Sequence, residues 1–178
     1  MYNKEKLNQI ISEKSVIQRV EQIADEISRS FKGEIPILVS VLNGSFIFTS
    51  DLVRAMKIDC EIDFIKVSTY FGDESKGRVD FQKDISIEIT NRHVIIVEDI
   101  IDSGLTVKFI RERFFNFEPK SIRIATLLMK PDVAKIDFEV NWLGFEIPPD
   151  YVVGYGLDYN QKFRNLRGIY ILGGNNYE

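Results

Sequence analysis

The sequence predicts an α/β fold in which a mainly parallel, twisted sheet is flanked by helices. The continuous apolar run 94–97 is typical of a strand buried on both faces, as inside a parallel sheet, and the largely apolar segment 35–42 also predicts a buried strand. These runs alternate with segments whose apolar residues recur at helical spacing, the order expected of β-α-β units. The 178 residues contain no repeat, low-complexity run or linker, so we expect a single domain.

The elements follow from these patterns in chain order. The first helix ends at Gly33, a residue that often follows a helix C-cap. One face of that helix carries Ile17, Val20, Ala24, Ile27 and Phe31. The polar, glycine-punctuated segment 71–78 predicts a mobile loop. The other expected elements are strands over 35–42, 62–70, 85–89, 121–129, 151–155 and 169–172, and helices from the turn at 43–45 to about 56 and over 107–117.

The composition narrows the class of protein. The apolar fraction of 44% and the charged fraction of 28% are ordinary for a globular chain. A net charge of −4 offers no basic surface for nucleic acid. The single Cys60 excludes an internal disulfide and a multi-cysteine zinc site. We find no apolar signal region and no span of membrane length, and therefore expect a soluble cytoplasmic protein with no membrane partner.

The most informative motif follows the apolar run over 94–97. Two adjacent carboxylates, Glu98 and Asp99, stop the run, and Asp102 and the Ser-Gly-Leu-Thr segment 103–106 come next. Open α/β sheets bind ligands at the carboxyl ends of their strands. Small residues before a helix can direct backbone amides at an anion. The motif therefore predicts a site for a ligand that has hydroxyls, a phosphate and a metal ion.

Two other interpretations of this motif are open. An acidic pair after a buried strand also occurs at the magnesium-binding strand of P-loop nucleotidases, but the chain has no G-x-x-x-x-G-K-[ST] loop and no G-x-G-x-x-G. In a purely structural interpretation, Glu98 and Asp99 are solvated strand-end residues and Ser103 caps the next helix.

The segment 94–106, Val-Ile-Ile-Val-Glu-Asp-Ile-Ile-Asp-Ser-Gly-Leu-Thr, resembles the phosphoribosyl-pyrophosphate motif of the type I phosphoribosyltransferases. Further stretches make the likeness specific to the hypoxanthine-guanine phosphoribosyltransferase family, and it extends from about 35 to 172. These stretches are 40–46, 68–70, 127–130, 144–148, 151–160 and 163–164.

This resemblance implies the type I phosphoribosyltransferase fold, with a core over about 15–150. A small hood subdomain would be formed by the N-terminal residues and about 145–178, and the loop at 71–78 would close over the active site. The implied reaction, in purine salvage, transfers ribose 5-phosphate from phosphoribosyl pyrophosphate to N9 of hypoxanthine or guanine. It yields IMP or GMP and pyrophosphate, with Mg²⁺ as cofactor. The family commonly forms homodimers or homotetramers.

The resemblance assigns the acidic motif to the sugar donor. Glu98 and Asp99 would accept hydrogen bonds from the ribose hydroxyls, directly or through Mg²⁺ and water. Asp102 is implied to be the catalytic acid or base near N7 of the purine, and helix capping is its alternative role. The ribose 5-phosphate site comprises Glu98, Asp99, Asp102, Ser103, Gly104, Leu105 and Thr106.

The resemblance also supplies the pyrophosphate and metal sites. The implied pyrophosphate contacts are Asn43, Gly44, Thr69, Tyr70 and Arg164, and the implied metal ligands are Glu98, Asp99 and Asp158. Many family members carry a basic residue where this chain has Asn43, so an ionic role at that position is in doubt while a backbone role remains. Thr69 stands where the family usually has serine, and keeps the hydroxyl.

The implied purine site comprises Lys130, Tyr151, Val152, Leu157 and Asp158. The Lys130 ammonium is purely a hydrogen-bond donor and favours a 6-oxo purine over adenine; its alternative is a strand-end lysine facing solvent. Tyr151 would stack on the base, and Val152 would offer its carbonyl to the purine edge. Core packing is the alternative role for Tyr151 and Leu157, and we expect the lone His93 to be structural.

Two alternative functions are open. One is a related phosphoribosyltransferase that prefers xanthine. The other is a non-catalytic regulator that senses phosphoribosyl pyrophosphate and binds RNA or a protein, although the net charge of −4 argues against a basic RNA-binding face.

Overall fold

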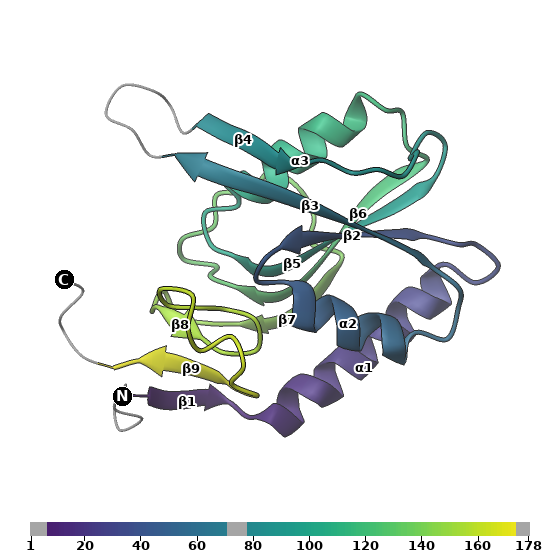
Figure 1. The fold of residues 1–178 in the computed structure, drawn as a ribbon. Helices are drawn as coiled ribbons and strands as arrows, with labels where there is room; N and C mark the ends of the chain where they lie inside the picture. The colour runs from purple at the N-terminus through teal and green to yellow at the C-terminus, as the bar shows by residue number, and fades with distance from the viewer. Residues whose placement is uncertain (1–6, 71–77, 174–178) are drawn as a thin grey trace.

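The computed structural model describes residues 7–70 and 78–173, whose strands form a larger and a smaller sheet (Figure 1). The larger sheet has the strand order β4 (Arg78–Lys83), β3 (Glu61–Tyr70), β2 (Ile37–Leu42), β5 (His93–Ile101), β6 (Ser121–Met129) and β7 (Trp142–Glu146). All of its neighbouring strands run parallel except β3 and β4. The expected mainly parallel α/β sheet is confirmed.

Helices cover both faces of this sheet, α1 and α2 on one side and α3 on the other (Figure 1). Their bounds are α1 (Glu13–Ser30), α2 (Phe46–Ala55) and α3 (Leu105–Phe115). Ile95 and Val97 of β5 pack in the core cluster that contains α1 and α2, whereas Val94 and Ile96 pack with α3. Because β5 is buried on both faces, its residues 94–97 form a continuous apolar run.

The smaller sheet joins the two ends of the described chain. It has the order β1 (Leu7–Ile11), β9 (Ile169–Leu172) and β8 (Val152–Val153), with antiparallel pairing throughout. The strand expected over 151–155 is shorter than predicted because Gly154, Tyr155 and Gly156 all have positive φ and turn the chain away. The sequence analysis did not predict β1 or β7 as strands.

Two other expectations are wrong in detail. Ile17 does not share the buried face of α1: its exposed fraction is 44%, while Val16 and Ile23 are fully buried. The segment 85–89 does not form the expected strand, and β4 lies just before it. The alternating apolar pattern over 85–89 therefore reflects packing of a non-strand segment, since Ile89 is buried and Ile85 and Ile87 contact the α3-side core.

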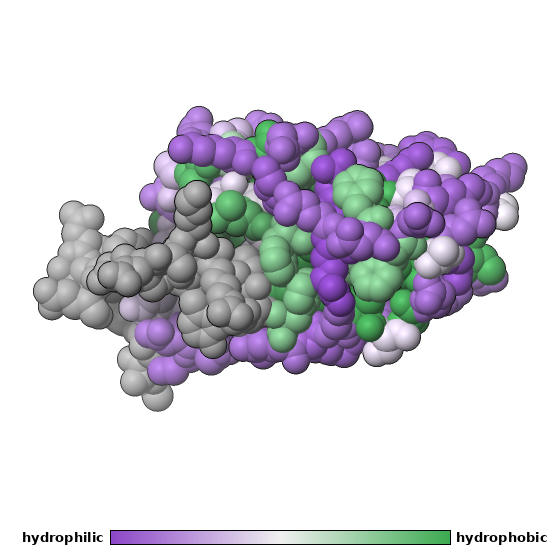
Figure 2. Space-filling view, turned by 90° about the horizontal axis from the view of Figure 1, so that it is seen from above, coloured by the Kyte–Doolittle hydropathy of each residue, from purple (hydrophilic) through white to green (hydrophobic). Residues whose placement is uncertain are grey.

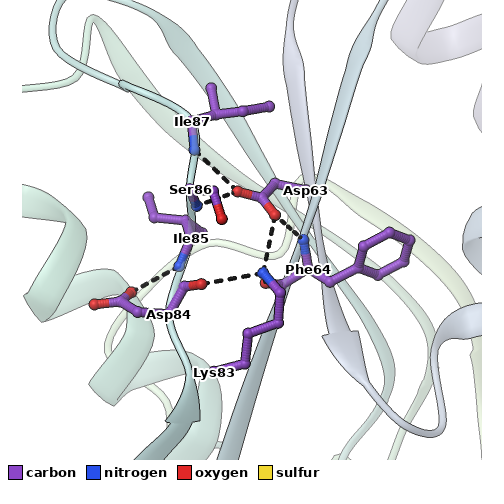
Figure 3. Close-up of polar contacts among 7 residues, drawn as sticks. All are labelled: Asp63, Phe64, Lys83, Asp84, Ile85, Ser86 and Ile87. Carbon is purple, nitrogen blue, oxygen red and sulfur yellow. Dashed lines mark hydrogen bonds and ion pairs between the residues drawn. The ribbon is translucent and has the colours of Figure 1, made fainter.

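The carboxylate of Asp63 explains why that segment is not a strand (Figure 3). Its Oδ2 accepts hydrogen bonds from the backbone N–H groups of Ser86 and of Ile87, the latter at 3.0 Å. Its Oδ1 accepts from Phe64 N–H at 2.7 Å and from Lys83 Nζ at 3.1 Å. Burial alone would raise the pKa of Asp63, but these four donors lower it. The donors at 86 and 87 are thereby committed to a side chain and not to a strand ladder.

The outer side of α3 keeps apolar rings at the surface among charged side chains, as the view from above shows (Figure 2). Phe115 is 54% exposed, and the Arg111 guanidinium lies 4.9 Å from the centroid of its ring.

Across residues 7–70 and 78–173, no helix combines the length and apolar character needed to span a membrane.

Candidate active site

The carboxyl ends of β2 and β5 open into one cavity of about 350 Å³. Parallel strands bring their carboxyl ends to the same edge of a sheet, so residues far apart in sequence meet there. Asp158 and Arg164, from the segment after β8, complete the wall. The predicted site residues that line the cavity are Asn43, Gly44, Glu98, Asp99, Asp102, Ser103, Gly104, Thr106, Asp158 and Arg164.

Glu98 and Asp99 form a buried acidic pair in this wall. Glu98 is 5% exposed, and its Oε2 has no hydrogen-bond partner among the described residues. Burial, and then the neighbouring charge of Asp99, raise the pKa of Glu98 well above its usual value. Burial also raises the pKa of Asp99. Two carboxylates held this close with a free oxygen need a cation or a set of hydroxyl donors to stabilise their charge.

This donor set fits a hard divalent cation. Mg²⁺ is commonly held by one or two carboxylates together with waters and substrate phosphates, not by a protein cage. The described ranges contain no group of three or more acidic, histidine or cysteine side chains placed to hold a metal. An ion here would therefore need ligands from a bound substrate as well as from the acidic pair.

The segment after β5 leads into α3 through Gly104. Gly104 has φ +85°, and a Cβ atom there would lie 2.3 Å from Ile136 Cγ2. Gly104 is the N-cap residue of α3, with no side-chain cap bond, so Ser103 is not that cap. Ser103 Oγ accepts from the Leu105 N–H at 3.4 Å, and the other N–H groups at this helix N-terminus can bind an anion in the cavity. Leu105 is 47% exposed and does not line the cavity.

Asp102 is tied to the predicted purine lysine. Lys130 Nζ lies 2.8 Å from Asp102 Oδ2, and the Lys130 residue is only 7% exposed. Because Lys130 is buried, the alternative in which it faces solvent is wrong. A buried ammonium requires a charged or strongly polar partner, and Asp102 is that partner. The Asp102 carboxylate makes this ion pair and no cap bond to α3. One carboxylate therefore connects the phosphate loop with the lysine that follows β6.

The segment 151–158 places Tyr151 at the surface. Tyr151 is 41% exposed, and its ring lies edge-on to Tyr159 with the centroids 5.8 Å apart. Its hydroxyl donates to the carbonyl of Asp158 at 2.9 Å. Val152 and Leu157 are buried in the α1–α2 core cluster and do not line the cavity. For Leu157 this burial favours the core-packing interpretation.

Asp158 and Arg164 form the opposite wall of the cavity. Arg164 Nη2 lies 2.8 Å from Asp158 Oδ1, and Arg164 Nη1 donates to the carbonyl of Gly156 at 2.8 Å. The second Asp158 oxygen accepts from Gln161 N–H at 2.8 Å. The Arg164 charge also opposes the burial-driven rise in the pKa of Asp99. Arg164 therefore presents positive charge beside the acidic pair.

The turn after β2 touches both of these walls through Gly44. A Cβ atom on Gly44 would lie 1.5 Å from Asp99 Oδ2, and a Cβ on Gly156 would lie 2.0 Å from Gly44 O. The peptide bond between Leu42 and Asn43 is cis. Only glycine fits at these two close approaches. The sequence analysis did not predict this contact. The Gly-Tyr-Gly sequence at 154–156 is the feature of the sequence that could have indicated a close backbone approach there.

Other predicted residues lie at the margin of the described structure. Thr69 and Tyr70 end β3, paired with Val79 and Arg78 of β4, but their side chains and the expected loop at 71–77 lie outside the described residues. His93 begins β5 at the opposite end of the sheet, with Nδ1 2.6 Å from Ser121 Oγ.

A family model described as "Phosphoribosyl transferase domain" matches residues 6–160. The chain is 39% identical over 164 residues to the hypoxanthine-guanine phosphoribosyltransferase of Bacillus subtilis, covering 92% of this chain and 91% of that protein. A hypoxanthine-guanine phosphoribosyltransferase structure from Bacillus anthracis aligns with TM-score 0.86 and 43% identity, covering 92% and 96% of the two chains. A hypoxanthine phosphoribosyltransferase structure from Staphylococcus aureus aligns with TM-score 0.92 and 36% identity, covering 98% and 96%.

Proposed function

The chain belongs to the phosphoribosyl transferase domain family, and from this premise we propose that it acts as a hypoxanthine-guanine phosphoribosyltransferase. It transfers ribose 5-phosphate from phosphoribosyl pyrophosphate to N9 of hypoxanthine or guanine and releases pyrophosphate. The products are IMP and GMP, so the reaction recovers purine bases in the cytoplasm.

The observation that carries this proposal is the position of Asp102. Its backbone belongs to the loop that leads into α3, where the 5′-phosphate would bind. Its carboxylate lies 2.8 Å from Lys130 Nζ, where the 6-oxo group of a purine would bind. A donor site and an acceptor site therefore meet at one side chain, as a transfer between two ligands requires.

The chemistry follows from the charges in the cavity. Departure of pyrophosphate builds positive charge on the ribose ring, and the acidic pair Glu98–Asp99 stabilises that charge and binds the ribose hydroxyls. Asp102 exchanges a proton with N7 of the purine while N9 attacks C1 of the sugar. Lys130 donates to O6 and discriminates against the 6-amino group of adenine.

The other wall of the cavity holds the leaving group. Arg164 offers a fixed fork of donors to the pyrophosphate oxygens, and Asn43 and Gly44 offer backbone groups. Mg²⁺ held by Glu98 and Asp99, and a second ion held by Asp158, each with substrate oxygens, would neutralise charge on the pyrophosphate.

The remaining predicted contacts complete the substrate site. Tyr151 stacks on the base, and Val152 contributes its carbonyl to the purine edge. Ser103 to Thr106 surround the 5′-phosphate with amides and hydroxyls. The smaller sheet β1-β9-β8 serves as the hood over the purine.

The test is pyrophosphate release from phosphoribosyl pyrophosphate with hypoxanthine, guanine, xanthine and adenine offered separately, with and without Mg²⁺. We expect turnover with the first two bases only, and only with the metal. The relatives reported above are named for hypoxanthine or hypoxanthine and guanine, which does not support a xanthine-preferring enzyme or a non-catalytic sensor. Turnover with none of the four bases would refute the enzymatic function.

We also propose a homodimer or homotetramer. Ile62 and Phe64 project from one face of β3 with exposed fractions of 41% and 37%, and a second copy of the chain would cover them. Light scattering coupled to size-exclusion chromatography should give two or four times the chain mass of 20.6 kDa. A mass equal to one chain would refute this.

A further inference from the structure

We propose that a buried chain of three hydroxyl groups, on Thr49, Ser40 and Ser45, positions the turn 42–44 for binding pyrophosphate. The inference rests on the proposed function. Ser40 lies on β2, Ser45 precedes α2, and Thr49 lies in the first turn of that helix. Ser40 and Ser45 are 0% exposed and Thr49 is 3% exposed. None of the three lines the cavity, so any effect on a ligand must act through the turn.

The direction of the chain follows from counting donors. Ser45 Oγ lies 2.5 Å from the carbonyl oxygen of Val41, which can only accept, so the Ser45 proton is used there. In the 2.7 Å contact between Ser40 Oγ and Ser45 Oγ, Ser40 must therefore donate. Thr49 Oγ1 in turn donates to Ser40 Oγ at 2.8 Å. Every proton in the chain has one acceptor, and the series ends at Val41.

Ser45 serves this chain instead of capping its helix. Serine is a favoured N-cap residue because its oxygen can accept from the first turn of a helix. Ser45 occupies the N-cap position of α2 but makes no such bond. Its backbone N–H and its hydroxyl both reach the Val41 carbonyl, at 3.4 and 2.5 Å. The hydroxyl thus joins the last part of β2 to the start of α2 and closes the turn between them.

This closure sets the position of the turn in the active site. Gly44, next to Ser45, lies against the Asp99 carboxylate so closely that a Cβ atom would be 1.5 Å from Oδ2. Leu42, Asn43 and Gly44 all line the cavity. A turn that opened by a fraction of an ångström would move the backbone groups that the proposed function assigns to pyrophosphate. Ser45 is therefore a positioning residue.

The experiment compares Ser45→Ala and Thr49→Val with the wild type. We expect Ser45→Ala to raise the KM for phosphoribosyl pyrophosphate and the Kd for pyrophosphate by roughly fivefold, the size of one neutral hydrogen bond. The KM for hypoxanthine should stay within about twofold, a change smaller than one such bond. Thr49→Val removes only the far end of the chain and should have a smaller effect. Thr49→Ser keeps the hydroxyl and should restore wild-type values.

Ser28→Ala is the matched control. Ser28 is also buried, donates to Ala24 O at 2.7 Å and accepts from Lys57 N–H at 3.0 Å, but does not line the cavity. It should lower the unfolding midpoint and leave both pyrophosphate-linked constants unchanged.

Wild-type constants for Ser45→Ala, or an equal rise for Ser28→Ala, would overturn the inference. If the wild type turns over no base, the proposed function fails. Calorimetric titration with pyrophosphate and Mg²⁺ then still decides the inference. Weaker binding by Ser45→Ala than by the wild type supports it, and equal binding or no binding by both overturns it.

Discussion

Replacing Asp63 with asparagine tests whether one carboxylate holds the chain after β4. Asparagine keeps the shape of the side chain but offers one acceptor oxygen where aspartate offers two. If that oxygen faces Ser86 and Ile87, the amide NH₂ group faces the N–H of Phe64 and the ammonium of Lys83. Donors then oppose donors at a residue that is only 7% exposed.

The size of the effect can be worked from these contacts. A hydrogen bond to a charged group contributes about 1.5–3 kcal/mol, and at least one such bond, from Phe64 N–H, is lost. The Lys83 side chain is 41% exposed, so its ion pair adds less than about 1 kcal/mol. We expect Asp63→Asn to lower the free energy of unfolding by about 3 kcal/mol, or Tm by roughly 6–12 °C.

Urea unfolding at neutral pH measures this change as a shift in midpoint at constant m-value. Asp137→Asn is the control, because the Asp137 carboxylate is 67% exposed and pairs only at the surface with Lys108; its midpoint should barely move. The pKa of Asp63 is lowered in the folded state, so its stabilisation is present above the unfolded pKa and is lost as pH falls through the folded one. The gap between wild type and Asp63→Asn should therefore shrink below about pH 5. Equal urea midpoints for the wild type and Asp63→Asn would refute the reasoning. A difference between these two midpoints that does not change with pH would also refute it.

Two more predictions concern the site, and a third concerns stability. Lys130→Met should raise the KM for hypoxanthine and guanine by roughly ten- to hundredfold, the worth of a charge-assisted hydrogen bond, and should relax the rejection of adenine; an unaltered base preference would contradict it. Gly44→Ala should lower kcat/KM at least about a hundredfold, because the alanine Cβ would displace the Asp99 carboxylate. Steady-state kinetics would measure this fall in kcat/KM. Tyr155→Phe should lower the free energy of unfolding by about 1 kcal/mol, since the buried hydroxyl donates to Asp51 at 2.7 Å; an unchanged urea midpoint would count against this.

The sequence predicted the bounds of two strands without error. The expected strands at 121–129 and 169–172 coincide with β6 and β9. The first strand, β1, was missed because its partner β9 lies at the other end of the chain, and short strands depend on such non-local pairing. The strand expected over 85–89 had the right alternation, but the Asp63 carboxylate takes its N–H groups. Periodicity reports which residues are apolar, and it does not report where a backbone donor finds its acceptor.

The acidic part of the site was predictable for a related reason. Glu98 and Asp99 lie near the carboxyl end of the buried strand β5, so the position of that strand in the sheet places them at the binding edge. The contact between Asp102 and Lys130 joins residues on separate elements, and their spacing in the sequence carries no information about it. The same holds for Gly44, whose two close neighbours come from β5 and from the segment after β8.

Those close neighbours make the three parts of the cavity mechanically dependent on one another. Gly44 separates the Asp99 carboxylate from the backbone at Gly156, and no side chain fits between them. Arg164 donates to the carbonyl of that same Gly156, so the cation proposed for pyrophosphate is held by the segment that touches the turn. Because interiors are close-packed and deform little, a shift of the turn must move a carboxylate on one side or the arginine support on the other. The positions of the Asp99 carboxylate and of Arg164 therefore depend on whether the turn 42–44 stays closed. Closing that turn is the role we assign to Ser45.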